Sequence, residues 1–175
     1  MKKAFALALC AAMALSMTAC SGDSSEPPAS QSTVSQSSSG TPEQDGTYVD
    51  YQTLEEAQSA VGFDWTIPDS IGGSTDREFR VADGSVLDIL YKKDETRTAC
   101  LRKAMGTQDL SPASAQFERM EEVAVGDAVV SMKGANDLFS LAVWTDDTYT
   151  YSVSLETGLA QEELSQLVQS LQETV

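Results

Sequence analysis

The chain has 175 residues, of which 11 are basic, 27 are acidic and none is histidine, so its formal net charge at pH 7 is −16. This charge argues against nucleic-acid binding and against electrostatic attraction to anionic lipid, because both need a basic surface. The absence of histidine excludes Cys–His and Ser–His–Asp catalysis and histidine-based zinc sites. The simplest interpretation of the acidity is solubility, and a site for a cation or a basic partner is the alternative.

The N-terminus is expected to be a signal peptide, residues 1–19. Two lysines precede an uncharged apolar run at 4–15, which has the length of a signal-peptide core and is short for a membrane span. The run leads into Met17-Thr18-Ala19-Cys20, which resembles a bacterial lipobox with methionine in place of the usual leucine. We therefore expect cleavage before Cys20 and attachment of acyl chains such as palmitate. Cleavage without lipid and a retained apolar anchor are the alternatives.

Residues 20–46 are expected to form the lipid-anchor cysteine and a disordered linker. Nine serines lie between positions 21 and 40, with almost no large apolar residue. Such a composition cannot bury enough surface to offset the entropy of the chain. As a flexible coil the linker would span roughly 28 Å, which suits a spacer between membrane and domain.

Residues 47–175 are expected to form a single domain that begins and ends with a helix. Thr53 and Glu56 have the spacing of a capping box, and Gly62 ends the first helix. The last helix is predicted from about Gln161 to Gln172, because its apolar residues fall on one stripe. Between the helices, period-two patterns predict strands at about 79–81, 87–91, 96–103, 123–125, 128–132, 138–144 and 149–155. The predicted fold class is α+β, with a mostly antiparallel sheet of about six or seven strands in a meander, packed against the N-terminal and C-terminal helices.

Two hairpins have readable turns. A three-residue turn with Gly84 in the left-handed conformation is expected to pair Phe79 with Leu87 and to keep their apolar neighbours on one face. The second hairpin has a two-residue turn, Gly126-Asp127, that starts with glycine.

Five residues of the domain are candidates for binding: Arg102, Asp109, Trp144, Tyr149 and Tyr151. Arg102 or its neighbour Lys103 is expected to form an ion pair with Asp109 that pins the loop 106–111, and an anion site built on the arginine is the alternative. The three aromatic rings are expected to be core beneath a helix, and a platform for a sugar or peptide is the alternative. Cys100 is expected to be a buried small hydrophobe, and no metal site is expected at the acidic turns.

Three stretches resemble one family. They are Leu54-Glu55-Glu56-Ala57 through Gly62-Phe63 and Ile67-Pro68, the run 101–111, and Leu141-Ala142-Val143-Trp144 with Tyr149-Thr150-Tyr151-Ser152 and the closing helix. Together they are similar to the small extracytoplasmic domains of Gram-positive bacteria catalogued as domain of unknown function 4367. The resemblance covers about residues 50–172 and implies a single secreted or lipid-anchored domain, with no activity to carry over. Pro112, Ala113 and Ser114 depart from the glycine and acidic–aromatic pair of similar sequences, so the resemblance marks no site in that loop.

The sequence therefore predicts a lipoprotein on the outer face of the bacterial cell membrane that acts as a non-catalytic binding or regulatory module of the cell envelope. A carrier that holds an apolar ligand in a sheet–helix pocket is the alternative, followed by a hydrolase with paired carboxylates. No cofactor, metal or nucleic acid is expected. The expected partners of this monomer are the membrane, through the lipid on Cys20, and an unidentified envelope protein or ligand.

Overall fold

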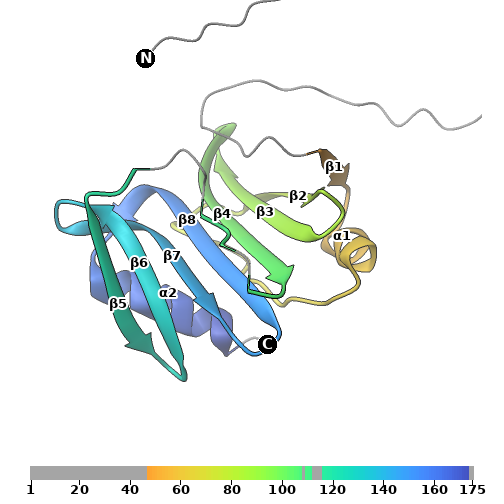
Figure 1. Cartoon of the computed structure of the whole chain (residues 1–175). Helices are drawn as coiled ribbons and strands as arrows, with labels where there is room; N and C mark the ends of the chain where they lie inside the picture. Colours follow the sequence, from red (N-terminus) through yellow and green to blue (C-terminus); the bar gives the residue numbers. More distant parts are fainter. Residues whose placement is uncertain (1–46, 108, 112–115, 174–175) are drawn as a thin grey trace, which may run out of the picture. The chain divides into compact units, whose positions relative to one another are not determined.

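The computed structural model describes residues 47–107, 109–111 and 116–173, all within the compact unit Gln36–Val175 (Figure 1). The predicted signal peptide, Cys20 and the predicted linker lie outside the described residues, so they stay predictions. No helix of the described ranges is both long enough and apolar enough for a membrane span.

The described part contains eight strands and two helices. In chain order they are β1 (Tyr48–Tyr51), α1 (Leu54–Val61), β2 (Asp76–Ala82), β3 (Val86–Lys93), β4 (Thr96–Met105), β5 (Arg119–Val125), β6 (Ala128–Ala135), β7 (Leu138–Thr145), β8 (Tyr149–Leu159) and α2 (Gln161–Gln172). The predicted α+β class and the bounds of the last helix are confirmed. The described sheet has eight strands rather than six or seven, because the short β1 carries too little alternation to be recognised.

All strands form one antiparallel sheet in the order β1-β2-β3-β4-β8-β7-β6-β5. Each half of the sheet is a meander of four consecutive strands. The two halves meet where β4 pairs with β8. The connection after β4 leads to the far edge of the sheet, where β5 begins, and the following strands return inward until β8 lies beside β4 (Figure 1). The last strand of the chain is therefore central, and its residues 150–153 are buried on both faces.

One face of the sheet packs against both helices. α1 lies over β2 and β3, α2 lies over β5, β7 and β8, and both helices contribute to one apolar cluster. Ala57 of α1 and Leu164 of α2 are fully buried in it, as are Leu87 and Ile89 of β3. Burial of this apolar surface is the main term that stabilises the domain.

Thr53 and Gly62 cap α1 as predicted, but the Glu56 side chain of the predicted capping box reaches the N–H of Gln52 rather than that of the N-cap Thr53. The Thr53 hydroxyl accepts a hydrogen bond from the Glu56 N–H at 3.2 Å, and the Glu56 carboxylate accepts one from the Gln52 N–H at 3.1 Å. Gly62 ends the helix with φ of 79°, a left-handed conformation that glycine adopts without strain.

In the two hairpins, the alternation of apolar and polar residues determines which face each side chain lies on, but not which residues pair across the turn. Gly84 is left-handed as expected, but the predicted pairing of Phe79 with Leu87 is wrong: Val81 lies opposite Leu87, and Phe79 lies opposite Ile89. An offset of two residues leaves every side chain on its predicted face, so the pattern could not detect it. The Gly126-Asp127 turn joins Val125 to Ala128 as predicted.

The other face of the sheet is also covered. Along β4, Cys100, Arg102 and Ala104 alternate with the core residues and are buried as well. Part of the connection from β4 to β5 lies on this face, because Thr150 of β8 donates to the Gly106 carbonyl at 2.7 Å and Lys133 of β6 donates to the Ser111 hydroxyl at 2.8 Å.

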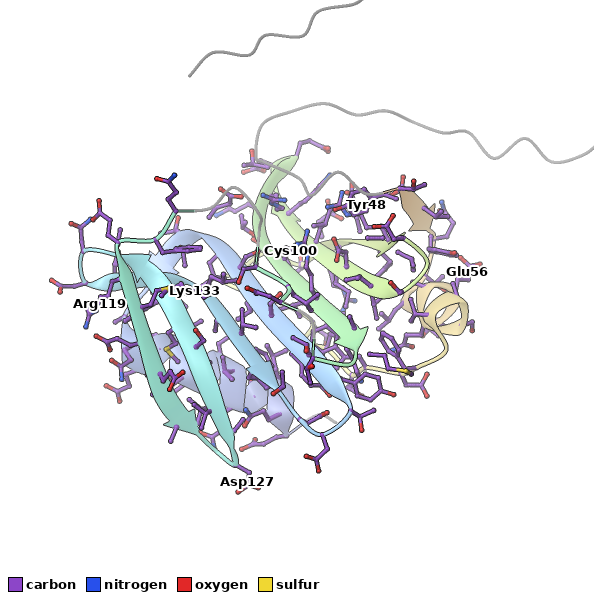
Figure 2. All side chains as sticks on the ribbon, viewed as in Figure 1. Tyr48, Glu56, Cys100, Arg119, Asp127 and Lys133 are labelled. Carbon is purple, nitrogen blue, oxygen red and sulfur yellow. The ribbon has the colours of Figure 1, made fainter. Side chains whose placement is uncertain are left out.

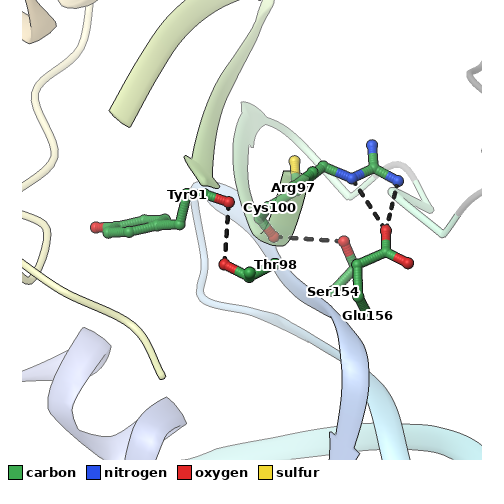
Figure 3. A network of polar contacts seen from close by, with 6 residues as sticks. All are labelled: Tyr91, Arg97, Thr98, Cys100, Ser154 and Glu156. Atoms are coloured by element: carbon green, nitrogen blue, oxygen red, sulfur yellow. Dashed lines mark hydrogen bonds and ion pairs between the residues drawn. The ribbon is translucent and has the colours of Figure 1, made fainter. Parts of the chain in front are cut away.

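Polar contacts also join β3, β4 and β8 (Figure 3). Arg97 binds the Glu156 carboxylate through Nε at 3.2 Å and through Nη2 at 3.0 Å, and the Thr98 hydroxyl donates to the Tyr91 carbonyl at 3.1 Å. The exposed Arg97–Glu156 pair contributes little to stability, but it matches the register of the two central strands.

Candidate functional site

An aromatic stack lies where β7 turns into β8. The rings of Trp144 and Tyr151 are parallel within 7°, with centroids 5.3 Å apart, and Trp65 meets Tyr151 edge-on at 5.7 Å. Trp144 is 4% exposed and Tyr151 is 2% exposed. Both rings therefore belong to the core, as the first of the two interpretations predicted.

A pocket of about 430 Å³ opens beside this stack, and we call it the turn pocket. It lies where the β5–β6 turn, the β7–β8 turn and the last turn of α2 meet. Its lining residues are Gly126, Asp127, Ala128, Trp144, Thr145, Asp146, Tyr151, Gln169, Leu171, Gln172 and Glu173. The volume is within the usual range of small-molecule sites, and the mixture of apolar wall and polar rim is typical of them.

Asp146 fixes the rim of the turn pocket to its wall. One carboxylate oxygen accepts hydrogen bonds from the backbone N–H groups of Thr148 at 2.7 Å and Tyr149 at 2.6 Å, and the other accepts one from the Tyr151 hydroxyl at 2.7 Å. Burial opposes the charged form of Asp146, but these hydrogen bonds outweigh it and hold the pKa of the carboxyl below its ordinary value. Burial, together with this hydrogen bond, raises the pKa of Tyr151, so the phenol remains the donor.

Tyr149, the third aromatic candidate, does not line the turn pocket. Its ring packs edge-on against Phe63 at 5.2 Å, and the ammonium of Lys103 lies 4.2 Å from its centroid. Lys103 is buried, donates to the Asp64 carbonyl at 2.7 Å, and has a pKa lowered by burial. The chain thus fills this aromatic cage with its own lysine.

The predicted ion pair of Arg102 or Lys103 with Asp109 is wrong. Arg102 instead binds Asp88 of the neighbouring strand, with Nε 3.1 Å from a carboxylate oxygen, and Lys103 points to the opposite face. Asp109 does hold its loop to the sheet, but its partner is Lys133 of β6 at 3.9 Å. The Ser111 side chain and N–H, with Lys133 nearby, hold the pKa of Asp109 below its ordinary value. The prediction from sequence proximity failed because the folded sheet brings β6 close to the loop that carries Asp109.

Asp88 is a residue that sequence reasoning missed. It is fully buried on the face opposite the helices, and the strand register places it directly between Arg80 of β2 and Arg102 of β4. Burial raises the pKa of Asp88, while the two guanidinium groups act in the other direction. A signal was present, because an aspartate interrupts the apolar run from Val86 to Tyr91. Its enclosed carboxylate forms ion pairs with two arginines and serves structure rather than chemistry.

Cys100 lies on the same face and is a free, buried thiol. Burial, and then the charge of Asp88, raises its pKa to about 11, so the thiol stays protonated at neutral pH. This agrees with the prediction of a small buried hydrophobe and gives no nucleophile.

The site lacks the features of a hydrolytic or metal centre. Within the described ranges, no group of three or more histidine, cysteine, aspartate or glutamate side chains is placed to hold a metal ion. Asp146 in the turn pocket has a lowered pKa, whereas a general acid needs a raised one. The arrangement is therefore better suited to holding a ligand than to transferring a proton.

A second pocket, of about 550 Å³, lies beside α1. Its lining includes Trp65, Phe79, and the pair of Arg77 and Asp69, which lie 3.5 Å apart. Both signs of charge are present there, whereas the charged residues that line the turn pocket are all acidic.

Comparison with known proteins adds no assignment. No protein-family model matches the chain, and neither curated proteins nor solved structures contain a match. The resemblance to domain of unknown function 4367 accordingly remains a prediction, and the function has to be argued from the site.

Proposed function

We propose that this chain is a lipid-anchored extracytoplasmic protein that acts as a non-catalytic binding module, with the turn pocket as its binding site. The lipobox at Cys20 and the serine-rich segment behind it support the anchor and the tether. The observation that carries the binding function is the concave turn pocket of about 430 Å³, with Trp144, Tyr151 and Leu171 among its lining residues. Membership of the family catalogued as domain of unknown function 4367 is part of the same proposal.

Rigidity supports binding at this place. The wall belongs to the core through the Trp144–Tyr151 stack, and the β7–β8 rim is fixed by the hydrogen bonds to Asp146. A site that is already formed before its ligand arrives loses little conformational entropy on binding. Such preorganisation is what a recognition module requires.

A carrier for an apolar ligand is the second candidate, since part of the turn pocket lies between the sheet and α2. In the described part of the domain, an apolar cluster occupies much of the interface between the sheet and the two helices. The turn pocket also has Asp127 and Glu173 in its lining, whose charges a neutral apolar ligand would leave uncompensated. These observations favour a recognition module over a carrier.

The proposal can be tested by photo-crosslinking in cells. A benzoylphenylalanine replaces Gln169, which is exposed and lines the turn pocket, or Gln166, which is exposed on the same helix outside the pocket lining. We expect a discrete adduct from position 169 only, and loss of that adduct when Ala128→Leu fills the pocket. Equal adducts from both positions, or none from either, would contradict a binding role for the turn pocket.

A further inference from the structure

We infer that the turn pocket recognises a basic side chain, lysine or arginine, presented by a partner polypeptide. This inference rests on the proposed binding function and specifies its ligand. Four observations carry it: the charge of the rim, the end of α2, the aromatic wall and the charge of the whole chain.

The rim of the turn pocket carries one sign of charge. Asp127, Asp146 and Glu173 line it, and among the described residues no lysine or arginine does. Asp127 lies at the tip of the β5–β6 hairpin (Figure 2), and Glu173 follows the last residue of α2, so the carboxylates come from three separate elements. Carboxylates that converge on a partly enclosed space attract a cation more strongly than carboxylates spread over an open surface.

The end of α2 adds negative potential at the same place. The C-terminus of a helix carries a partial negative charge, because its last carbonyl groups lack partners within the helix. Gln169, Leu171 and Gln172 of the last turn line the turn pocket, and that turn contains no basic residue. Within its own last turn, α2 therefore lacks the lysine or arginine that proteins commonly place at a helix C-terminus.

The wall suits the remainder of such a side chain. Lysine and arginine lay their aliphatic stems on apolar surface and keep their charged ends at a polar rim. The wall offers Ala128 to the stem, with Leu171 and the Trp144 ring behind it at 1% and 4% exposure. The same domain uses this chemistry internally, since Lys103 lies over the Tyr149 ring and is buried among aromatic residues.

The net charge of −16 favours a basic polypeptide over a free amine as the source of the cation. A strongly acidic chain speeds the approach of a basic partner, and contacts around the pocket add to those of one side chain. The pocket opens at a hairpin tip and a helix end, where a partner chain has access.

The test uses the ¹⁵N-labelled full chain and capped pentapeptides. The first probe is acetyl-Gly-Ser-Lys-Ser-Gly-amide, and the second has acetyl-lysine at the centre, which keeps the stem and removes the charge. We expect the lysine peptide to shift the amide signals of Ala128, Thr145 and Glu173, and the acetyl-lysine peptide to bind about tenfold more weakly. A rise in ionic strength from about 0.05 to 0.5 M should weaken the lysine peptide severalfold.

Matched variants locate the effect. Asp127→Asn and Glu173→Gln should each weaken the lysine peptide by about fivefold. Asp147→Asn, beside the pocket, and Glu162→Gln, at the other end of α2, should leave binding unchanged because neither residue lines the pocket. None of these residues is buried, so the variants are expected to fold.

The outcomes are distinguishable. Equal binding of the lysine and acetyl-lysine peptides would overturn the cationic ligand and leave the proposed binding function standing. If butylammonium bound as tightly as the lysine peptide, the occupant would be a free amine and the polypeptide partner would be wrong. Absence of shifts with any probe at roughly 10 mM would overturn the inference, while the crosslinking at position 169 would decide the proposed function separately.

Discussion

The Tyr151 hydroxyl donates a hydrogen bond of 2.7 Å to the carboxylate of Asp146, five residues earlier in the chain. This contact links a ring of the sheet core to the turn that precedes its own strand. Because the same carboxylate accepts the N–H groups of Thr148 and Tyr149, one aspartate sets both the shape of the turn and the rim of the turn pocket.

The first prediction concerns the charge of Asp146. Its pKa in the folded state lies below the ordinary value of 3.8, so its charged form contributes stability that is fully present above about pH 4. That contribution is lost as the pH falls through the lowered pKa. Asp146→Asn keeps an acceptor oxygen and removes the charge, and it should lower the free energy of unfolding at pH 7 by roughly 1 kcal/mol.

Urea unfolding between pH 2 and pH 7 measures this difference. The stability curves of the parent and Asp146→Asn should converge at the acid end and stay parallel near neutrality. The exposed neighbour Asp147→Asn serves as the control and should follow the parent. A constant difference between parent and Asp146→Asn down to pH 2 would show that the charge is not responsible.

The second prediction concerns the buried carboxylate of Asp88. Asp88→Asn preserves the shape but leaves Arg80 and Arg102 without their shared counter-charge in an enclosed site. Removing one partner of a buried ion pair costs about 3–5 kcal/mol, so a large fall in the denaturant midpoint is expected. Asp94→Asn, in the exposed turn after β3, is the control and should cost almost nothing. A loss below about 1 kcal/mol for Asp88→Asn would mean that the carboxylate is not charged in the folded domain.

The third prediction concerns Gly134, at the irregularity where β6 pairs with β7. A Cβ at this position would overlap the Leu138 carbonyl oxygen and lie 2.7 Å from the Phe139 Cα. These are backbone atoms, which cannot move aside as a side chain can, so Gly134→Ala should lose about 2–3 kcal/mol in thermal or urea unfolding. Ala135→Ser adds an atom at the next, exposed position and should be neutral. Full stability of Gly134→Ala would show that the two strands can separate at this point.

The fourth prediction concerns attachment to the membrane. Cells fed a labelled fatty acid should transfer the label to the parent chain and to Cys10→Ala, because Cys10 lies inside the segment expected to be removed. Cys20→Ala should carry no label and should leave the membrane fraction. Label retained by Cys20→Ala would refute lipidation at this cysteine.

The sequence was sufficient wherever a signal is local. The Thr53 N-cap, the glycine after α1, the Gly126-Asp127 turn and the stripe of α2 each depend on residues a few positions apart, and each forms as predicted. Alternation also assigned the faces of β3 correctly. The alternation could not give the register between β2 and β3, because a shift of two residues leaves every side chain on the same face of the sheet. It also could not reveal β1, which has only four residues.

In the candidate site, too, some features follow from the local sequence and others only from the folded chain. Trp144, Tyr149 and Tyr151 could be chosen from their pattern, but only the folded chain separates the two that line the turn pocket from the one that encloses Lys103. The partners of Arg102 and Asp109 were misassigned, because each binds a residue of a strand that sequence distance does not indicate.

The sequence by itself determined the α+β class, the helices, the charge of the domain and the expectation of a lipid anchor, since these depend on composition and on neighbouring residues. The tertiary structure alone decided that β8 lies beside β4, that Asp88 lies between two arginines, and that three acidic residues from separate elements line one pocket. The physical reason is that a strand's alternation specifies which face is buried but not which strand lies beside it. Pairing between distant strands, and every site made by it, follows from the packing of the whole chain.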